Sequence, residues 1–187
     1  MESVKYLSLA GGGIKGIMYI GMIRALSRHI PLLYNGLTYI EWLQTMNGFA
    51  GSSIGALTAL TMLLNLGTDK VDELMKPMLE NLQSVAPRPD ITGLFTNYGL
   101  DDGSSLRDII ERVLSTGGLS PKVTFIDLKR LLQKDFVVTA TNAHTQTLKL
   151  FSPDTTPYAS VGDAVYMSMT LPFLFEPMRY EGEFMLD

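Results

Sequence analysis

A serine between two glycines is the feature of this sequence that points most directly to chemistry. Residues 51–55 read Gly-Ser-Ser-Ile-Gly, which is the pattern G-x-S-x-G with Ser53 in the central position. A sharp turn from a strand into a helix exposes a serine hydroxyl, and the small residues Gly51 and Gly55 leave room for such a turn. The N–H group of Ile54 then lies at a helix N-terminus, where it favours developing negative charge. The pattern is typical of a nucleophilic serine.

The segments around Ser53 decide how much weight the pentapeptide carries. With glycine and serine each at about 7% of residues, the pattern occurs by chance in roughly one chain in fifteen of this length. Here residues 46–50 are an apolar segment typical of a short strand, and residues 54–66 are rich in Ala and Leu, as in a buried helix. Strand, serine and helix therefore follow one another in the order that the turn requires.

A second glycine-rich segment lies near the N-terminus. Residues 4–9 are mostly apolar and rich in strand formers, and residues 11–16 read Gly-Gly-Gly-Ile-Lys-Gly. Apolar residues then recur at helical spacing, so we expect a helix that ends near Arg28 and is stopped by Pro31. The segment is therefore predicted to be a glycine loop between a strand and a helix.

Three interpretations of this glycine loop were compared. Gly11, Gly13 and Gly16 match the dinucleotide-binding fingerprint, but the nearest acidic residue further on, Glu41, does not end a strand as that fingerprint requires. The phosphate-binding P-loop pattern fails because Gly16 is followed by Ile and Met instead of Lys and Ser or Thr. The third interpretation is an oxyanion hole formed by glycine N–H groups at the start of a helix.

A nucleophilic serine needs a base that takes its proton. His29 lies at a helix end and His144 in a predicted hairpin turn, where solvated polar residues are expected, so the usual Ser-His-Asp triad is poorly supported. Asp187 directly follows the strand-like residues 184–186, and open α/β sheets place their sites beyond the carboxyl ends of strands. A Ser53–Asp187 dyad is therefore expected, with His144 as the alternative base. The site would have to raise the pKa of Asp187, because an ordinary aspartate is a weak base.

Composition excludes several classes of function. The chain has 187 residues, a formal net charge of −4, no cysteine and two histidines. These values argue against a nucleic-acid binder, a thiolate or histidine-rich metal site and a disulfide framework. No stretch has the roughly 18 apolar residues of a membrane span, and the N-terminus lacks the basic region of a signal peptide. We expect a cytoplasmic or peripherally membrane-associated protein.

The remaining segments are predicted from their turn and strand signals. Residues 85–102 are too long for an ordinary connection and are expected to form a lid or binding loop. The helix after Ser53 is expected to end near Asn65, with Gly67 as its C′ residue. Strands are predicted at residues 136–141 and 147–151, a helix at 161–169 and a hairpin at 178–186.

Taken together, these motifs resemble the patatin-like phospholipases. Residues 11–16 look like that family's G-G-G-x-[KR]-G oxyanion motif, and residues 51–55 look like its G-x-S-x-G elbow. Residues 136–142, the segment from Met167 to Pro172 and the approach to Asp187 also resemble the family. The similarity runs nearly from end to end.

The resemblance implies a three-layer α/β/α fold with a mainly parallel central sheet, formed here by one domain over residues 1–187. It also implies a lipid acyl hydrolase that cleaves carboxylic ester bonds of phospholipids or related acyl lipids through a Ser–Asp dyad and an acyl-enzyme. Ser53 would be the nucleophile and Asp187 the base, and no metal or other cofactor is implied. The partner would be a membrane or micellar lipid, approached by peripheral contact.

The resemblance also implies further site residues. The N–H groups of Gly12, Gly13 and Ile54 would hold the oxyanion, and Lys15 occupies the family's basic position beside the glycines. The family's last motif is D-G-[GA], whereas this sequence stops at Asp187, so we expect an incomplete domain that is weakly active alone. A soluble esterase or thioesterase with a histidine base, a catalytically silent lipid-binding protein and a nucleotide-binding protein remain as alternatives.

Overall fold

The computed structural model describes residues 4–81 and 98–187 of the chain. Its strands are β1 (Tyr6–Leu9), β2 (Gly48–Ser52), β3 (Gly99–Asp101), β4 (Asp135–Asn142), β5 (Thr147–Phe151), β6 (Phe173–Phe175), β7 (Met178–Tyr180) and β8 (Glu183–Leu186). Its helices are α1 (Ile17–Leu33), α2 (Tyr39–Gln44), α3 (Ile54–Leu63), α4 (Thr68–Asn81), α6 (Ser104–Thr116), α7 (Phe125–Leu132) and α8 (Val161–Met169), with a short 3-10 turn, η1 (Gly13–Gly16), before α1. Most of the expected lid lies outside the described residues.

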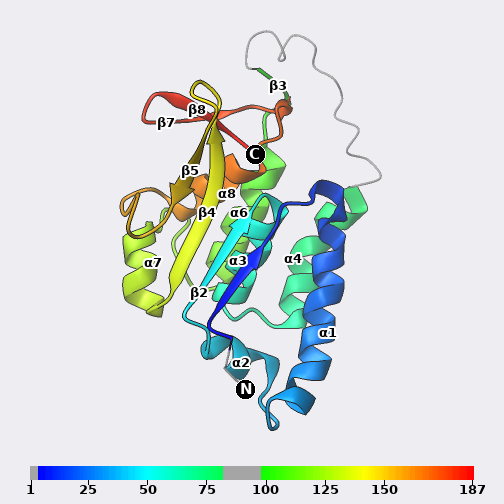
Figure 1. Cartoon of the computed structure of the whole chain (residues 1–187). Coiled ribbons are helices and arrows are strands. Elements are labelled where there is room, and N and C mark those ends of the chain that lie inside the picture. The colour runs from blue at the N-terminus through cyan, green and yellow to red at the C-terminus, as the bar shows by residue number, and fades with distance from the viewer. Residues whose placement is uncertain (1–3, 82–97) are drawn as a thin grey trace.

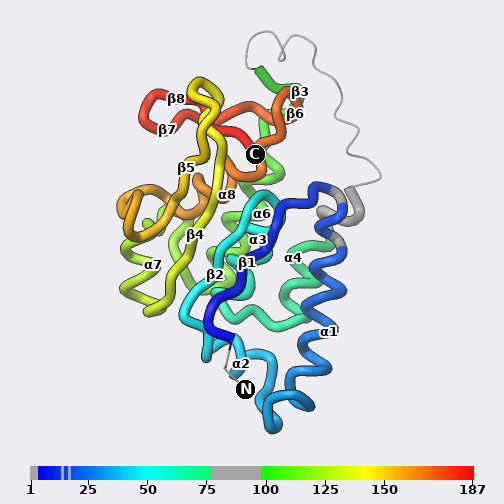
Figure 2. The backbone as a smooth tube through the Cα atoms, in the orientation of Figure 1, coloured from blue at the N-terminus to red at the C-terminus, as the bar shows by residue number. Residues whose placement is uncertain are grey.

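Strands β1, β2 and β4 form the parallel centre of the main sheet (Figure 1). The order of strands is β1-β2-β4-β8-β7, with β5 paired to β4 in antiparallel orientation. Two further strands, β3 and β6, form a small parallel sheet close to the C-terminus (Figure 2). The predicted α/β class with a parallel sheet at its centre is confirmed.

One feature of the strand pairing brings two distant parts of the chain together. Strand β2 pairs with residues 135–139 of β4, and β8 pairs with Thr141 and Asn142 further along β4. Strand β5 also pairs with Thr139 and Thr141, so it occupies the opposite edge of β4, and β2 and β8 share one edge. Because β8 is antiparallel to β4, β2 and β8 approach each other end to end, and their carboxyl ends meet beside Ala140.

Helices cover one face of the parallel strands (Figure 1). All ten residues of α3 are buried between the sheet and its neighbouring helices, which explains why this segment is apolar all round. The two threonines of α3 satisfy their hydroxyls by donating to helix carbonyls, Thr58 to Ile54 and Thr61 to Thr58. On the other face, the Tyr6 side chain is 59% exposed. The described residues thus form the sheet and one helical layer, and the second helical layer of the expected three-layer α/β/α arrangement is not observed among them (Figure 1).

Two helix ends differ from the prediction. Helix α1 does not stop at Pro31 but contains it and continues to Leu33. The proline ring has a helical φ, and the absent N–H removes one hydrogen bond within the last turn, where little helix remains to be disrupted. The predicted C′ residue Gly67 is also wrong. Asn65 takes the left-handed conformation there, and the Leu66 N–H donates to the Thr61 carbonyl, as in a Schellman motif.

Candidate active site

Ser53 occupies a sharp turn between β2 and α3. Its backbone lies at φ 52°, ψ −132°, and its side chain is only 5% exposed. A positive φ is strained for a residue with a Cβ and persists only where surrounding contacts hold it. This backbone conformation turns the chain from the strand direction into α3 and places Ser53 beyond the end of the sheet. The G-x-S-x-G segment therefore has the elbow geometry predicted from its sequence.

The glycines of the elbow are required by close backbone contacts. A Cβ at Gly55 would lie 2.3 Å from the Leu9 carbonyl oxygen, and one at Gly51 would lie 2.5 Å from the Ala56 nitrogen. Both contacts are with backbone atoms, which cannot move aside as a flexible side chain would. Gly55 therefore lets the elbow pack against the end of β1, and Gly51 lets the chain turn back closely onto the start of α3.

The glycine loop lies against the elbow. A Cβ at Gly11 would be 3.2 Å from the Ser53 Cβ, and one at Gly16 would be 2.3 Å from Ile54 Cγ1. The Tyr19 hydroxyl donates to the Ala10 carbonyl at 2.6 Å and thereby ties the start of the loop to α1. The structure thus brings the two glycine motifs together, although they are about forty residues apart in the chain.

The three consecutive glycines at the start of this loop, Gly11 to Gly13, are exposed to solvent. Gly13 has a φ of 50°. The Lys15 N–H donates to the Gly12 carbonyl at 3.0 Å, which closes the tight turn, and Lys15 itself is exposed. Exposed loop N–H groups near the N-terminus of α3, where Ile54 is the first helical residue, form a setting that favours an anion.

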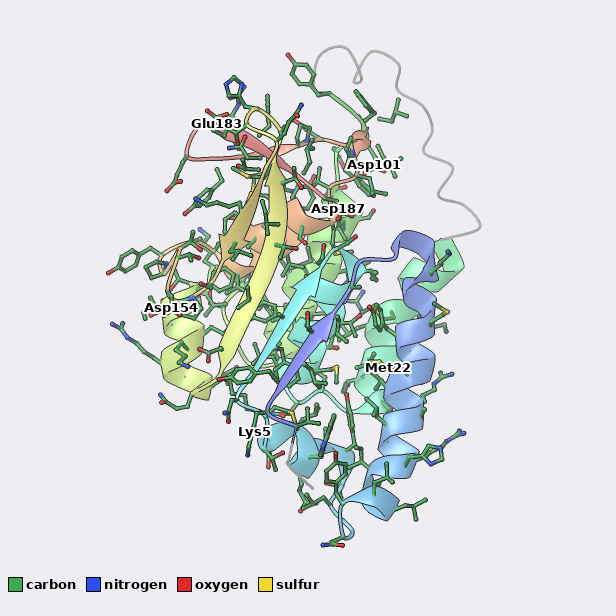
Figure 3. All side chains as sticks on the ribbon, in the orientation of Figure 1. Lys5, Met22, Asp101, Asp154, Glu183 and Asp187 are labelled. Atoms are coloured by element: carbon green, nitrogen blue, oxygen red, sulfur yellow. The ribbon has the colours of Figure 1, made fainter. Side chains whose placement is uncertain are left out.

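Asp187 reaches the elbow from the end of β8. Its N–H donates to the Thr170 carbonyl at 2.9 Å, and Figure 3 shows it at the opposite end of the sheet from Lys5. Although Asp187 as a whole residue is exposed, partial burial of its carboxyl raises the pKa of that group, and the neighbouring Ser53 hydroxyl lowers it by a smaller amount. A raised pKa makes this carboxylate a stronger base than an ordinary aspartate.

The two histidines lie elsewhere. His29 is an exposed residue of α1, and His144 is exposed in the turn between β4 and β5, where its N–H donates to Asn142 Oδ1. Neither contributes to the pKa shift of Asp187. The geometry therefore favours Asp187 over His144 as the partner of Ser53.

Sequence reasoning missed two residues that hold this arrangement. The Ser168 hydroxyl accepts the backbone N–H of Ser53 at 2.8 Å in the buried interior, and the Thr170 carbonyl accepts the N–H of Asp187. Ser168 lay within a segment whose similarity to the family was noted, but no spacing rule connects it with a residue 115 positions away.

Other locations for a site are less well supported. A hollow of about 340 Å³ on the open face of the sheet is lined by Tyr6, Ala50 and Val137 among others, but by neither Ser53 nor Asp187. Within residues 4–81 and 98–187, no three His, Asp or Glu side chains are grouped so that they could hold a metal ion. In the same ranges, no helix combines the length and apolar character needed to cross a bilayer.

Comparison with known families decides the classification. The model of the patatin-like phospholipase family matches residues 7–187, which is nearly the whole chain. The chain belongs to this family. The three motifs on which the resemblance rested, the glycine loop, the elbow and the approach to Asp187, all fall within the matched range.

Two curated viral proteins are similar to the patatin-like chain. An uncharacterised protein of Acanthamoeba polyphaga mimivirus is 24% identical over 185 residues, covering 97% of this chain and 57% of the relative. A probable lipid hydrolase of Invertebrate iridescent virus 6 is 23% identical over 192 residues, covering 98% of this chain and 59% of the relative. The chain thus spans less than three fifths of the length of these relatives.

Two solved structures share the fold. VipD from Legionella pneumophila superposes with a TM-score of 0.69 at 20% identity, over 99% of this chain and 46% of VipD. ExoU from Pseudomonas aeruginosa, solved in a heterodimeric complex with SpcU, superposes with a TM-score of 0.61 at 22% identity, over 92% of this chain and 37% of the matched chain. At this level of identity the likeness concerns the fold.

Proposed function

We propose that this patatin-like chain is a lipid acyl hydrolase that uses Ser53 as nucleophile and Asp187 as general base. The observation that carries the proposal is the meeting of the two residues: a serine on a strained elbow faces a carboxyl whose pKa is raised by burial. A serine hydroxyl becomes reactive when an adjacent base accepts its proton. Family membership and the similarity to a probable lipid hydrolase support an acyl lipid as substrate.

The reaction follows from the positions of these groups. Ser53 Oγ attacks the ester carbonyl carbon while Asp187 takes the hydroxyl proton. The carbonyl oxygen becomes an oxyanion, which the N–H groups of Gly12, Gly13 and Ile54 stabilise. The ester C–O bond then breaks, and the departing alcohol takes the proton from Asp187, which leaves an acyl group on Ser53. Asp187 next removes a proton from a water molecule, whose oxygen attacks the acyl carbon. The bond from that carbon to Ser53 Oγ then breaks, Asp187 returns the proton to Ser53 Oγ, and the fatty acid is released.

Lys15 suits a phosphate-bearing substrate. It is an exposed cation in the turn that holds Gly12 and Gly13, so a lipid bound with its ester carbonyl in the proposed oxyanion hole brings its head group close to this charge. The substrate class is therefore a phospholipid or lysophospholipid presented by a membrane or micelle, which the protein contacts peripherally.

A defined lipid panel tests this function. Purified protein is incubated with phosphatidylcholine, lysophosphatidylcholine, phosphatidylglycerol and triacylglycerol in mixed micelles, and released fatty acid is measured. A fluorophosphonate probe reports the reactive serine directly. We expect fatty-acid release and covalent labelling in the wild type, and a loss of both by at least about 1000-fold in Ser53→Ala. Labelling that persists in Ser53→Ala overturns the proposal. Vesicle binding without any hydrolysis identifies a catalytically silent lipid-binding protein instead.

A further inference from the structure

The backbone N–H of Ser53 is a donor that the elbow itself cannot satisfy. The ladder of β2 ends at Ser52, and α3 begins at Ile54, so Ser53 lies between the two regular elements. The first N–H groups of a helix have no partner within the helix, and a buried N–H without a partner destabilises the fold. In this structure the donor finds the Ser168 hydroxyl oxygen, 2.8 Å away. Ser168 is completely buried, so water does not replace it.

This hydrogen bond controls the conformation that matters for reaction. The direction of an N–H group depends on the φ angle of its residue, and Ser53 holds the strained φ of 52°. An acceptor fixed at the end of the N–H therefore resists relaxation of the elbow toward an unstrained conformation. Because Ser53 Oγ is carried on the same backbone, this hydrogen bond also restricts where Oγ can lie relative to Asp187.

The same short segment also holds Asp187. Two residues beyond Ser168, the Thr170 carbonyl accepts the Asp187 N–H at 2.9 Å. Thr170 is itself completely buried, and its hydroxyl donates to the Tyr166 carbonyl at 2.9 Å. One turn of chain thus contacts the backbone of both reacting residues.

Further contacts hold α8, and with it residues 168–170, in place against the rest of the fold. The Tyr166 ring is 1% exposed, its hydroxyl donates to the Glu176 carbonyl at 2.7 Å, and the Arg107 guanidinium lies 3.7 Å from the ring centroid. These contacts join α8 to α6 on one side and to the chain before β7 on the other. At the opposite end of α8, the Ser160 hydroxyl caps the helix by accepting the Asp163 N–H.

We infer that residues 168–170, here called the α8 clamp, are a positioning element for the proposed reaction: Ser168 sets the position of Ser53, and Thr170 sets that of Asp187. The inference rests on the proposed function, because positioning matters only if the two residues react together. Reacting groups lose about 100-fold in rate when they are misplaced by about 1 Å, so a clamp on both backbones has a direct effect on turnover.

The partial charges at the ends of α3 and α8 also favour the proposed reaction. The N-terminus of α3 beside Ser53 carries partial positive charge, which favours the oxyanion. The C-terminus of α8 beside Asp187 carries partial negative charge, which disfavours a carboxylate and therefore strengthens it as a base. Both ends are held in place by the clamp that joins α8 to the elbow.

Ser168→Ala in the intact protein tests the inference, because it removes the acceptor and leaves the packing nearly unchanged. Four quantities are measured: the second-order rate of fluorophosphonate labelling, kcat and KM on the soluble ester p-nitrophenyl butyrate, and the thermal midpoint. We expect labelling rate and kcat to fall about 10- to 100-fold, with KM changed less than about 2-fold. Ser168→Cys, with sulfur as a weak acceptor of similar size, is expected to lie between wild type and Ser168→Ala.

The matched control is Ser152→Ala. Ser152 is also a buried serine, 6% exposed, whose hydroxyl accepts backbone N–H groups, but it lies beyond β5 on the other edge of β4. The Ser152→Ala substitution should change the stability of the protein without changing the activity of the folded protein. If Ser168→Ala loses no more kcat than the control, the α8 clamp is purely structural and the inference is wrong. If labelling persists in Ser53→Ala, the proposed function itself fails. The two failures are therefore distinguishable.

Discussion

The Ser53 hydroxyl faces the Asp187 carboxyl, and two opposing effects act on the pKa of that carboxyl. Partial burial, the larger effect, disfavours the charge and raises the pKa, whereas the hydroxyl stabilises the charge and lowers it. The net shift is upward. In a Ser–Asp dyad the carboxyl must be ionised to accept the serine proton, so this balance sets the pH range in which the proposed enzyme works.

The first prediction concerns the pH dependence of activity. Since the pKa of Asp187 is raised, activity should be lost as the pH falls through a value above the ordinary aspartate pKa of about 3.9. Asp187→Asn is expected to lower kcat/KM by about 100-fold or more and to remove this acidic limb. Both expectations are checked by measuring kcat/KM of wild type and Asp187→Asn on a soluble ester between about pH 4 and pH 9. An Asp187→Asn profile that keeps the wild-type acidic limb would assign the base to another residue.

The second prediction concerns the packing of the elbow. Gly55→Ala places a Cβ 2.3 Å from the Leu9 carbonyl oxygen and should lower the free energy of unfolding by about 2 kcal/mol or more. Gly21→Ala is the matched control, because a Cβ at Gly21 meets nothing within 4 Å and this residue lies inside α1. The control should stabilise the protein by about 0.5 to 1 kcal/mol. Urea unfolding compares the two, and equal effects would contradict the prediction.

The third prediction addresses the histidine alternative. His144 is exposed in the turn between β4 and β5 and does not shift the pKa of Asp187. His144→Ala should therefore leave fluorophosphonate labelling and ester hydrolysis within about 2-fold of wild type. A loss of activity comparable to that expected for Asp187→Asn would instead favour an esterase with a histidine base.

The fourth prediction concerns a buried lysine outside the site. Lys134 is 8% exposed, its Nζ donates to the Leu43 carbonyl at 2.7 Å, and burial lowers its pKa. Between the lowered folded pKa and the unfolded value of about 10.4, the unfolded state binds more protons, so stability rises with pH. The free energy of unfolding of wild type minus that of Lys134→Met should therefore increase between about pH 7 and pH 10. Urea unfolding at both ends of this range measures it, and a constant difference would show that burial of Lys134 is not coupled to its charge.

Local features of the site could be predicted from the sequence because they depend on neighbouring residues alone. The elbow at Ser53 follows from an apolar strand, two glycines and an apolar helix in succession. Where local signals competed, as with Asn65 and Gly67 at the end of α3, glycine preference favoured Gly67, whereas the structure uses Asn65.

The position of Asp187 shows where sequence reasoning reached its limit. The carboxyl-end rule for open α/β sheets led to this residue, but β8 is antiparallel to β4, so the rule does not describe why Asp187 reaches the site. It reaches Ser53 because β2 and β8 share one edge of β4 and meet end to end. That arrangement is a property of strand pairing over the whole chain.

The sequence by itself determined the family, the nucleophile elbow and the glycine loop, because steric demands and hydrophobic periodicity act between residues that are close in the chain. Only the tertiary structure decided how these parts face one another. The hydrogen bond from the Ser53 N–H to Ser168 spans 115 residues, and its formation depends on how α8 packs on the sheet. Burial, which raises the pKa of Asp187, likewise exists only once the chain has folded.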